Sequence, residues 1–194
     1  MKTRILSAAI LVALASFGAS AQTTADTVQR DVNQQTRIEK GLQDGSLSTK
    51  EASRLESEQS KIDRLQAKEL KDGKLTPQER VQLRRAQNHA SQDIKAAEAN
   101  GVKGNSESKS SERMQADVQR NINQEKRIEQ GVKSGELTNR ETGKLERGQA
   151  RVDHAEAVAG SDGHVGKNEQ ARIQRKENRQ SGEIYKKKHN GIER

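Results

Sequence analysis

The sequence contains two copies of one long segment, and this duplication constrains the fold more than any other feature. The stretch QRDVNQQTRIEKGLQDGSLSTKEASRLESEQSKID starts at Gln29, and QRNINQEKRIEQGVKSGELTNRETGKLERGQARVD starts at Gln119. The alignment of 28–101 with 118–191 needs no gap. A duplicated segment predicts a structural unit that occurs twice.

Within each copy, the apolar residues recur at spacings of mostly three, four or seven, which is the period of a helix buried along one face. In the first copy these residues are Val28, Val32, Ile38 and Leu42, then Ala52, Leu55, Ile62 and Leu65, then Leu83, Ala86, Ala90, Ile94 and Ala97. Aromatic residues make up only 1% of the chain, so thin apolar stripes are expected rather than a thick core. We therefore predict an all-α fold with two tandem three-helix repeats, each a helical hairpin or small bundle, after a signal peptide.

The N-terminal residues have the pattern of a secretory signal peptide. A short basic start is followed by an apolar run over 5–16, and Ala19-Ser20-Ala21 fits a cleavage site. This run is too short to cross a bilayer, so no membrane span is expected. We predict a periplasmic or secreted protein. Its predicted organisation is a signal peptide at 1–21, a first helical repeat at 22–99, a linker at 100–112, and a second repeat at 113–194 with a basic C-terminal end.

The second copy has glycines at helical positions where the first copy has larger residues. Glycine inside a helix costs up to about 1 kcal/mol relative to alanine. The second repeat is therefore predicted to be the less stable one. Whether the two repeats pack together, and in what oligomeric state, the sequence leaves open. The three exchanges are Ser53 to Gly143, Glu58 to Gly148 and Leu70 to Gly160.

Four turns between the predicted helices share a sequence pattern, and they begin at Gly45, Gly73, Gly135 and Gly163. In the first three, an apolar residue is followed by Ser or Thr, and Glu lies three positions after that hydroxyl residue. In the fourth turn Gly166 stands in place of the hydroxyl residue. Ser or Thr followed by Glu at this spacing predicts a capping box, in which each side chain bonds the backbone of the other residue. Pro77 follows Thr76 at the first helical position, where proline is favoured. This interpretation explains the glutamates without an ion. The predicted helix caps are Ser48, Thr76 and Thr138.

The same turns resemble those of degenerate EF-hand-like secreted helical proteins of bacteria. In LKDGKLTPQE, residues 70–79, Asp72 and Gly73 would occupy loop positions five and six, and Glu79 the chelating position twelve. The resemblance implies calcium binding, and it is the basis for calcium as the one candidate cofactor. The ligand candidates that it implies are Asp44, Glu51, Asp72, Glu79, Glu141, Asp162 and Glu169.

No set of nucleophile, base and acid can be recognised, so we predict that the protein is not an enzyme. The histidines are isolated, which predicts solvated side chains. Carboxylates such as Glu56 and Glu58 are also interpreted as solvated among many other charges. The four histidines are His89, His154, His164 and His189.

The C-terminal end, 167–194, is rich in Lys and Arg and can attract polyanions. Nucleic acid is disfavoured because Tyr185 is the one aromatic residue that remains after the signal peptide. The predicted partner is an unknown envelope protein or an anionic surface. The predicted polyanion-binding residues are Arg175, Lys176, Arg179, Lys186, Lys187 and Lys188.

Three functional hypotheses follow from these features. The first is a non-catalytic structural or interaction protein of the bacterial cell envelope. The second is an EF-hand-like periplasmic protein that binds calcium or another metal. The third is a protein that binds a polyanion or an anionic surface.

Overall fold

A computed structural model describes the backbone of residues 12–192 and the side chains of residues 24–192. Over this part of the chain the fold is all-helical and contains no strand, which confirms the all-α part of the predicted fold class. Of the predicted signal peptide, residues 1–11 lie outside the described residues, and 12–21 belong to the first helix. The helices are α1 (Val12–Asp44), α2 (Thr49–Glu69), α3 (Pro77–Ala99), α4 (Lys109–Ser134), α5 (Asn139–Ala159) and α6 (Lys167–Lys188).

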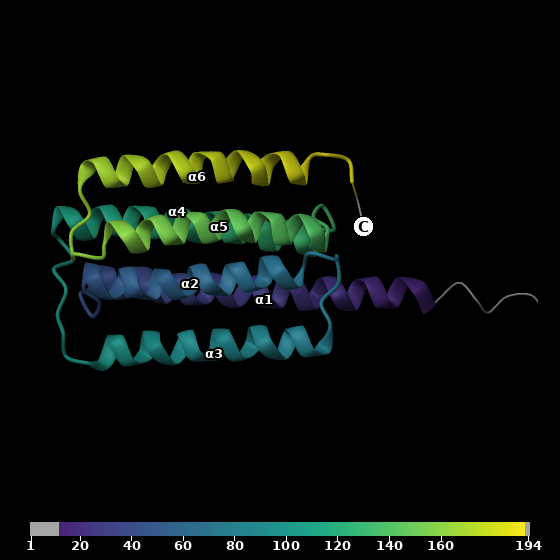
Figure 1. The fold of residues 1–194 in the computed structure, drawn as a ribbon, viewed down its shortest axis with the longest axis horizontal. Helices are drawn as coiled ribbons and strands as arrows, with labels where there is room; N and C mark the ends of the chain where they lie inside the picture. The colour runs from purple at the N-terminus through teal and green to yellow at the C-terminus, as the bar shows by residue number, and fades with distance from the viewer. Residues whose placement is uncertain (1–11, 193–194) are drawn as a thin grey trace, which may run out of the picture.

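The helices lie along one common direction and form four layers (Figure 1). Helices α1 and α2 form one inner layer, and α4 and α5 form the other. Helix α1 packs on α4, and α2 packs on α5, so the inner four helices combine both copies of the repeat. Helix α3 covers the first inner layer, and α6 covers the second. None of the helices within 12–192 combines the length and apolar character needed to cross a membrane.

The apolar core is shared between the two copies. One cluster joins Ile38 and Leu42 of the first copy to Met114 and Val118 of the second. Another cluster joins Val28 to residues of the second copy, namely Ile128, Val132, Leu137, Leu145 and Ile184. Each copy therefore removes its apolar stripe from water largely by covering the stripe of the other copy. The two copies therefore pack together, which the sequence left open.

Two of the additional glycines lie at the contact between α2 and α5, Gly143 within α5 and Gly160 at its C-terminal cap. A Cβ atom on Gly143 would lie 2.9 Å from the Leu70 Cβ, and one on Gly160 would lie 2.8 Å from the Ser53 Cβ. Both distances are shorter than side chains tolerate, so glycine is needed for this helix spacing. These glycines thus have a packing role that intrinsic helix propensity does not describe.

The segment between the copies packs against the turn that follows α1. The Gly104 N–H donates a hydrogen bond to the Gly45 carbonyl at 2.9 Å. Helix α4 already begins at Lys109, inside the predicted linker, because the Ser108 hydroxyl accepts from the Ser111 N–H at 3.1 Å and caps it.

Candidate metal centre

The glutamates of the four turns bond the backbone of their own helix caps. The Ser48 N–H donates to the Glu51 carboxylate at 3.0 Å, and the Glu51 N–H donates to the Ser48 hydroxyl at 3.3 Å. In the fourth turn Gly166 has no hydroxyl, and only its N–H contributes, at 2.8 Å from the carboxylate. These glutamates therefore satisfy backbone groups at helix ends. The other pairs are Glu79 with Thr76, Glu141 with Thr138, and Glu169 with Gly166.

The aspartates of the turns also accept hydrogen bonds from nearby backbone N–H groups, two residues later in the chain. Asp44 accepts from the Ser46 N–H at 2.9 Å, and Asp72 accepts from the Lys74 N–H at 2.8 Å. Asp162 accepts from the His164 N–H at 2.8 Å. Among the described residues, no turn carboxylate belongs to a group of three or more acidic or histidine side chains that converge.

Carboxylates instead converge inside the four-helix core, where the sequence interpretation did not place them. Glu56 and Glu146, which occupy the same position in the two copies, are 0% exposed. Asp63 and Asp153, another equivalent pair, are 2% exposed. The interpretation of Glu56 as a solvated carboxylate is therefore wrong, because α5 covers the face of α2 on which Glu56 lies.

The buried carboxylates form two clusters. The first acidic cluster consists of Asp63 on α2, Glu125 on α4 and Glu146 on α5. In each cluster, one candidate ligand atom from each residue lies within 4.8 Å of the others. Inward-facing carboxylates from facing helices are the usual way in which helical bundles hold metal ions. The second acidic cluster consists of Glu56, Asp153 and Glu156, from α2 and α5.

Side-chain amides hold the second acidic cluster from the two remaining core helices. The amide nitrogen of Asn121 on α4 donates to both Asp153 and Glu156 at 2.9 Å. The amide nitrogen of Gln35 on α1 donates to Glu56 at 2.9 Å. All four inner helices therefore contribute polar groups to this cluster.

The first acidic cluster has far fewer partners. Neither carboxylate oxygen of Glu146 has a hydrogen-bond partner, and one oxygen of Glu125 also has none. Burial raises the pKa of Glu125, and the neighbouring side chain of Gln149, 1% exposed, offsets this rise only in part. No well-aligned hydrogen bond reaches the side-chain nitrogen or oxygen of Gln149. Unsatisfied polar atoms at this depth are costly, so these side chains need a proton, a water molecule or an ion as a partner.

Among the described side chains, the core contains acidic residues and no basic ones. Among residues 24–192 no Lys, Arg or His is buried, so no cation of the chain neutralises the clusters from within. Burial is the largest cause that raises the pKa of all six carboxylates, and repulsion from neighbouring carboxylates adds to it. The pKa of Asp153 is raised to about 7. The carboxyl groups at these positions must therefore either keep their protons or bind cations.

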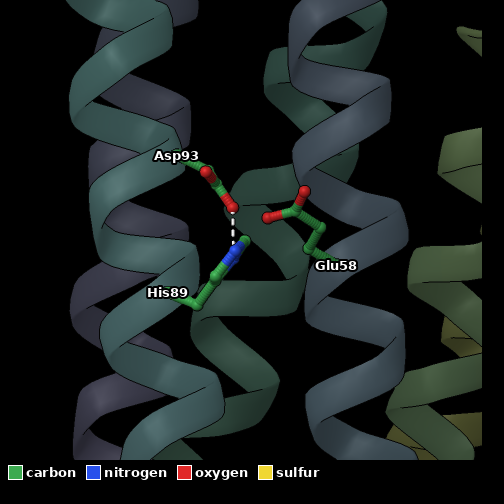
Figure 2. Close-up of side chains that lie close together, drawn as sticks. All are labelled: Glu58, His89 and Asp93. Carbon is green, nitrogen blue, oxygen red and sulfur yellow. Dashed lines mark ion pairs between the residues drawn. The ribbon is translucent and has the colours of Figure 1, made fainter.

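A third group of possible ligands lies at the surface between α2 and α3 (Figure 2). Glu58 points from α2 toward His89 and Asp93 on α3. The ring of His89 already pairs with Asp93 at 2.6 Å, and its side chain is 75% exposed. Burial and the neighbouring Asp93 raise the pKa of Glu58. This group is only partly buried, unlike the two acidic clusters, and its His–Asp pair is already formed.

The predicted polyanion-binding residues fall into two separate places. Arg175, Lys176 and Arg179 line a groove between α5 and α6. The three lysines at the end of α6 lie apart from the lining of this groove, and two of them have carboxylate partners. Lys186 pairs with Glu183 at 3.4 Å, and Lys188 pairs with Glu136 at 3.2 Å.

Comparison of the chain with known proteins gives no match among family models, curated proteins or solved structures. The residues themselves are therefore the basis for a function.

The sequence does contain a signal for the acidic clusters. Glu56 and Asp63 lie seven positions apart, on the same side of α2 as Leu55 and Ile62, and the same acids recur in the second copy.

Proposed function

We propose that this chain is a non-catalytic, exported helical protein that binds divalent cations between its two repeats. The observation that supports this most directly is the pair of buried acidic clusters: several of their oxygens lack a hydrogen-bond partner, and no Lys, Arg or His is buried among residues 24–192. In this proposal the turns serve as capped corners, and the ion ligands are the carboxylates of the core.

The ligand chemistry favours calcium. Both acidic clusters contain only oxygen donors, which suit Ca²⁺, Mg²⁺ and Mn²⁺ better than zinc or copper. Mg²⁺ usually retains several waters, whereas Ca²⁺ accepts an irregular shell of protein oxygens. The six carboxylate residues are at most 3% exposed, which leaves little room for bound water. Binding would release the protons that the raised pKa values retain, so affinity should rise with pH.

Thermal unfolding at pH 8, after treatment with EDTA, tests the proposal. Calcium at about a hundred times its Kd stabilises a folded chain by about 2.7 kcal/mol. For a chain of this size that corresponds to a rise in Tm of about 5 to 10 °C. We expect this rise in the native chain and expect Glu146→Gln to abolish most of it.

Two variants control for the other possible sites. Glu79→Gln changes a turn residue, and Glu58→Gln changes the surface group with His89 and Asp93. Both should retain the calcium response. A native chain whose Tm does not respond to millimolar calcium, magnesium or manganese would contradict the proposal. A response that disappears in Glu79→Gln and persists in Glu146→Gln would move the site to the turns.

We further propose that residues 1–21 are a signal peptide and that the mature chain is a duplicated three-helix unit in the periplasm or outside the cell. The basic start, the apolar run and Ala19-Ser20-Ala21 support the first statement. The gapless alignment of the copies supports the second. The intact mass of the exported protein provides the test, because a mature chain should begin at Gln22.

A further inference from the structure

A groove with a volume of about 390 Å³ runs between α5 and α6. Five basic residues line it, two more than the sequence analysis identified there. The two that it missed are Arg151 on α5 and Arg172 at the start of α6. The complete basic lining is Arg151, Arg172, Arg175, Lys176 and Arg179.

Glycine at position 148 forms part of the lining of the groove. Gln180 of α6 lies directly over Gly148 and donates its amide hydrogen to the Leu145 carbonyl at 2.9 Å. A Cβ atom on Gly148 would overlap the Gln180 side-chain oxygen. A larger residue would therefore displace the end of the Gln180 side chain from its place over position 148.

Among the described residues, no ion pair neutralises the basic side chains of the groove. None of the five basic residues forms an ion pair with a carboxylate in the described part of the chain. One acidic residue, Glu183, also lines the groove, but its carboxylate pairs with Lys186. Like charges that converge on a concave surface repel one another and attract an anion.

The first copy shows that this arrangement is specific to the second. The positions equivalent to Gly148, Arg179 and Glu183 are those of Glu58, His89 and Asp93, which form the acidic and imidazole group of Figure 2. Of the five basic positions of the groove, the first copy keeps a basic residue at two, Lys61 and Arg85, and has Gln82, Ala86 and His89 at the other three, so this place carries less positive charge in the first copy. A general solubilising role would not require this divergence of charge.

We propose that the groove between α5 and α6 binds a small anion that carries several phosphate groups. Guanidinium groups form paired, charge-assisted hydrogen bonds with phosphate oxygens, and four of the five basic residues are arginine. The volume of the groove is that of a small-molecule site. The phosphates could belong to a free polyphosphate or to a lipid headgroup, and the two sources are separable by experiment.

Calorimetric titration of the full-length mature chain with sodium tripolyphosphate, without divalent cations, tests the free-anion source. Sedimentation with vesicles that contain phosphatidylglycerol tests the lipid source. The groove variant is Arg175→Gln/Arg179→Gln. The control variant is Arg84→Gln/Arg85→Gln, which removes the same charge from exposed positions of α3 in the other copy.

We expect binding to at least one probe, about ten-fold weaker in the groove variant, which corresponds to the loss of about one charge-assisted contact. The control variant should bind as the native chain does. Binding to vesicles alone, lost in the groove variant, would assign the phosphates to a lipid headgroup. No binding to either probe, or equal weakening in both variants, would overturn the proposal. The calcium response of the core is measured separately and does not depend on this outcome.

Discussion

The hydroxyl of Ser60 on α2 donates a hydrogen bond to the carbonyl of Ala150 on α5 at 2.8 Å, and Ala150 is the residue at the same position in the other copy, 90 residues later. Equivalent residues meet where an approximate two-fold axis passes between α2 and α5. On either side of this axis the contacts occur in matched pairs, such as Leu70 with Gly143 and Ser53 with Gly160. The two copies thus face each other as the subunits of a symmetric dimer do.

The first prediction follows from this shared core. Separate chains of residues 22–103 and 110–194 should each have less helix than in the full chain, because each lacks the partner that covers its apolar stripe. Mixing the two at equal concentration should restore the helical signal. Circular dichroism measures both effects. Halves that each melt cooperatively with full helix content at low concentration would show two independent bundles.

The second prediction concerns the glycines of the second copy. Gly143→Ala should destabilise the protein, because the new Cβ would lie 2.9 Å from the Leu70 Cβ. Gly182→Ala in α6 is the matched control, since no atom lies within 4 Å of its added Cβ. This control should stabilise the protein by up to about 1 kcal/mol through helix propensity. Urea denaturation compares the two, and stabilisation by both changes would refute the packing role of Gly143.

The third prediction is that the ion-free protein loses stability as the pH rises. The pKa values of Asp31 and Asp153 are raised to about 7 by burial, whereas unfolded aspartate has a pKa of about 3.9. Between these values the folded state binds more protons than the unfolded state, so the free energy of unfolding falls with increasing pH. Stability should therefore be higher at pH 5 than at pH 8 in the presence of EDTA.

A neutral isostere separates the buried carboxylates from the general effect of charge in this third prediction. Glu146→Gln should raise the stability of the ion-free protein at pH 8 and flatten its dependence on pH, because a buried carboxylate without partners is removed. Glu107→Gln, at an exposed position, should leave the profile unchanged. An ion-free protein that is equally stable at pH 5 and pH 8 would show that the core carboxylates do not retain protons.

The fourth prediction separates the cap from the ion site in the second turn. Thr76→Ala should cost about 1 kcal/mol, the usual value of an N-cap. Glu79→Gln should cost less, because glutamine can replace glutamate in a capping box. Urea denaturation at pH 7 with EDTA measures both values without any ion. A larger loss in Glu79→Gln would mean that the charge of the glutamate, and not its hydrogen bond to Thr76, stabilises this turn.

Much of the local structure could be read from the sequence. The spacing of apolar residues identifies the helices from residue 22 onward, and Ser48, Thr76 and Thr138 lie where the structure has N-caps. These features depend on hydrogen bonds and contacts between residues three or four positions apart. Such interactions form in the same way wherever the helix lies in the fold, so the sequence alone determines them.

The environment of each helix face was decided by the tertiary structure. Glu56 and Glu58 are two residues apart on α2, yet α5 covers Glu56 completely and leaves Glu58 at the surface. In the sequence, Gly143 is only a residue that weakens a helix, whereas in the structure it allows Leu70 to pack closely against α5. Arg151 lines the groove because α6 lies beside α5. Burial and electrostatics depend on which helices, far apart in the chain, come into contact. Helical periodicity alone does not contain that information, because a polar residue next to an apolar stripe can face either water or a neighbouring helix.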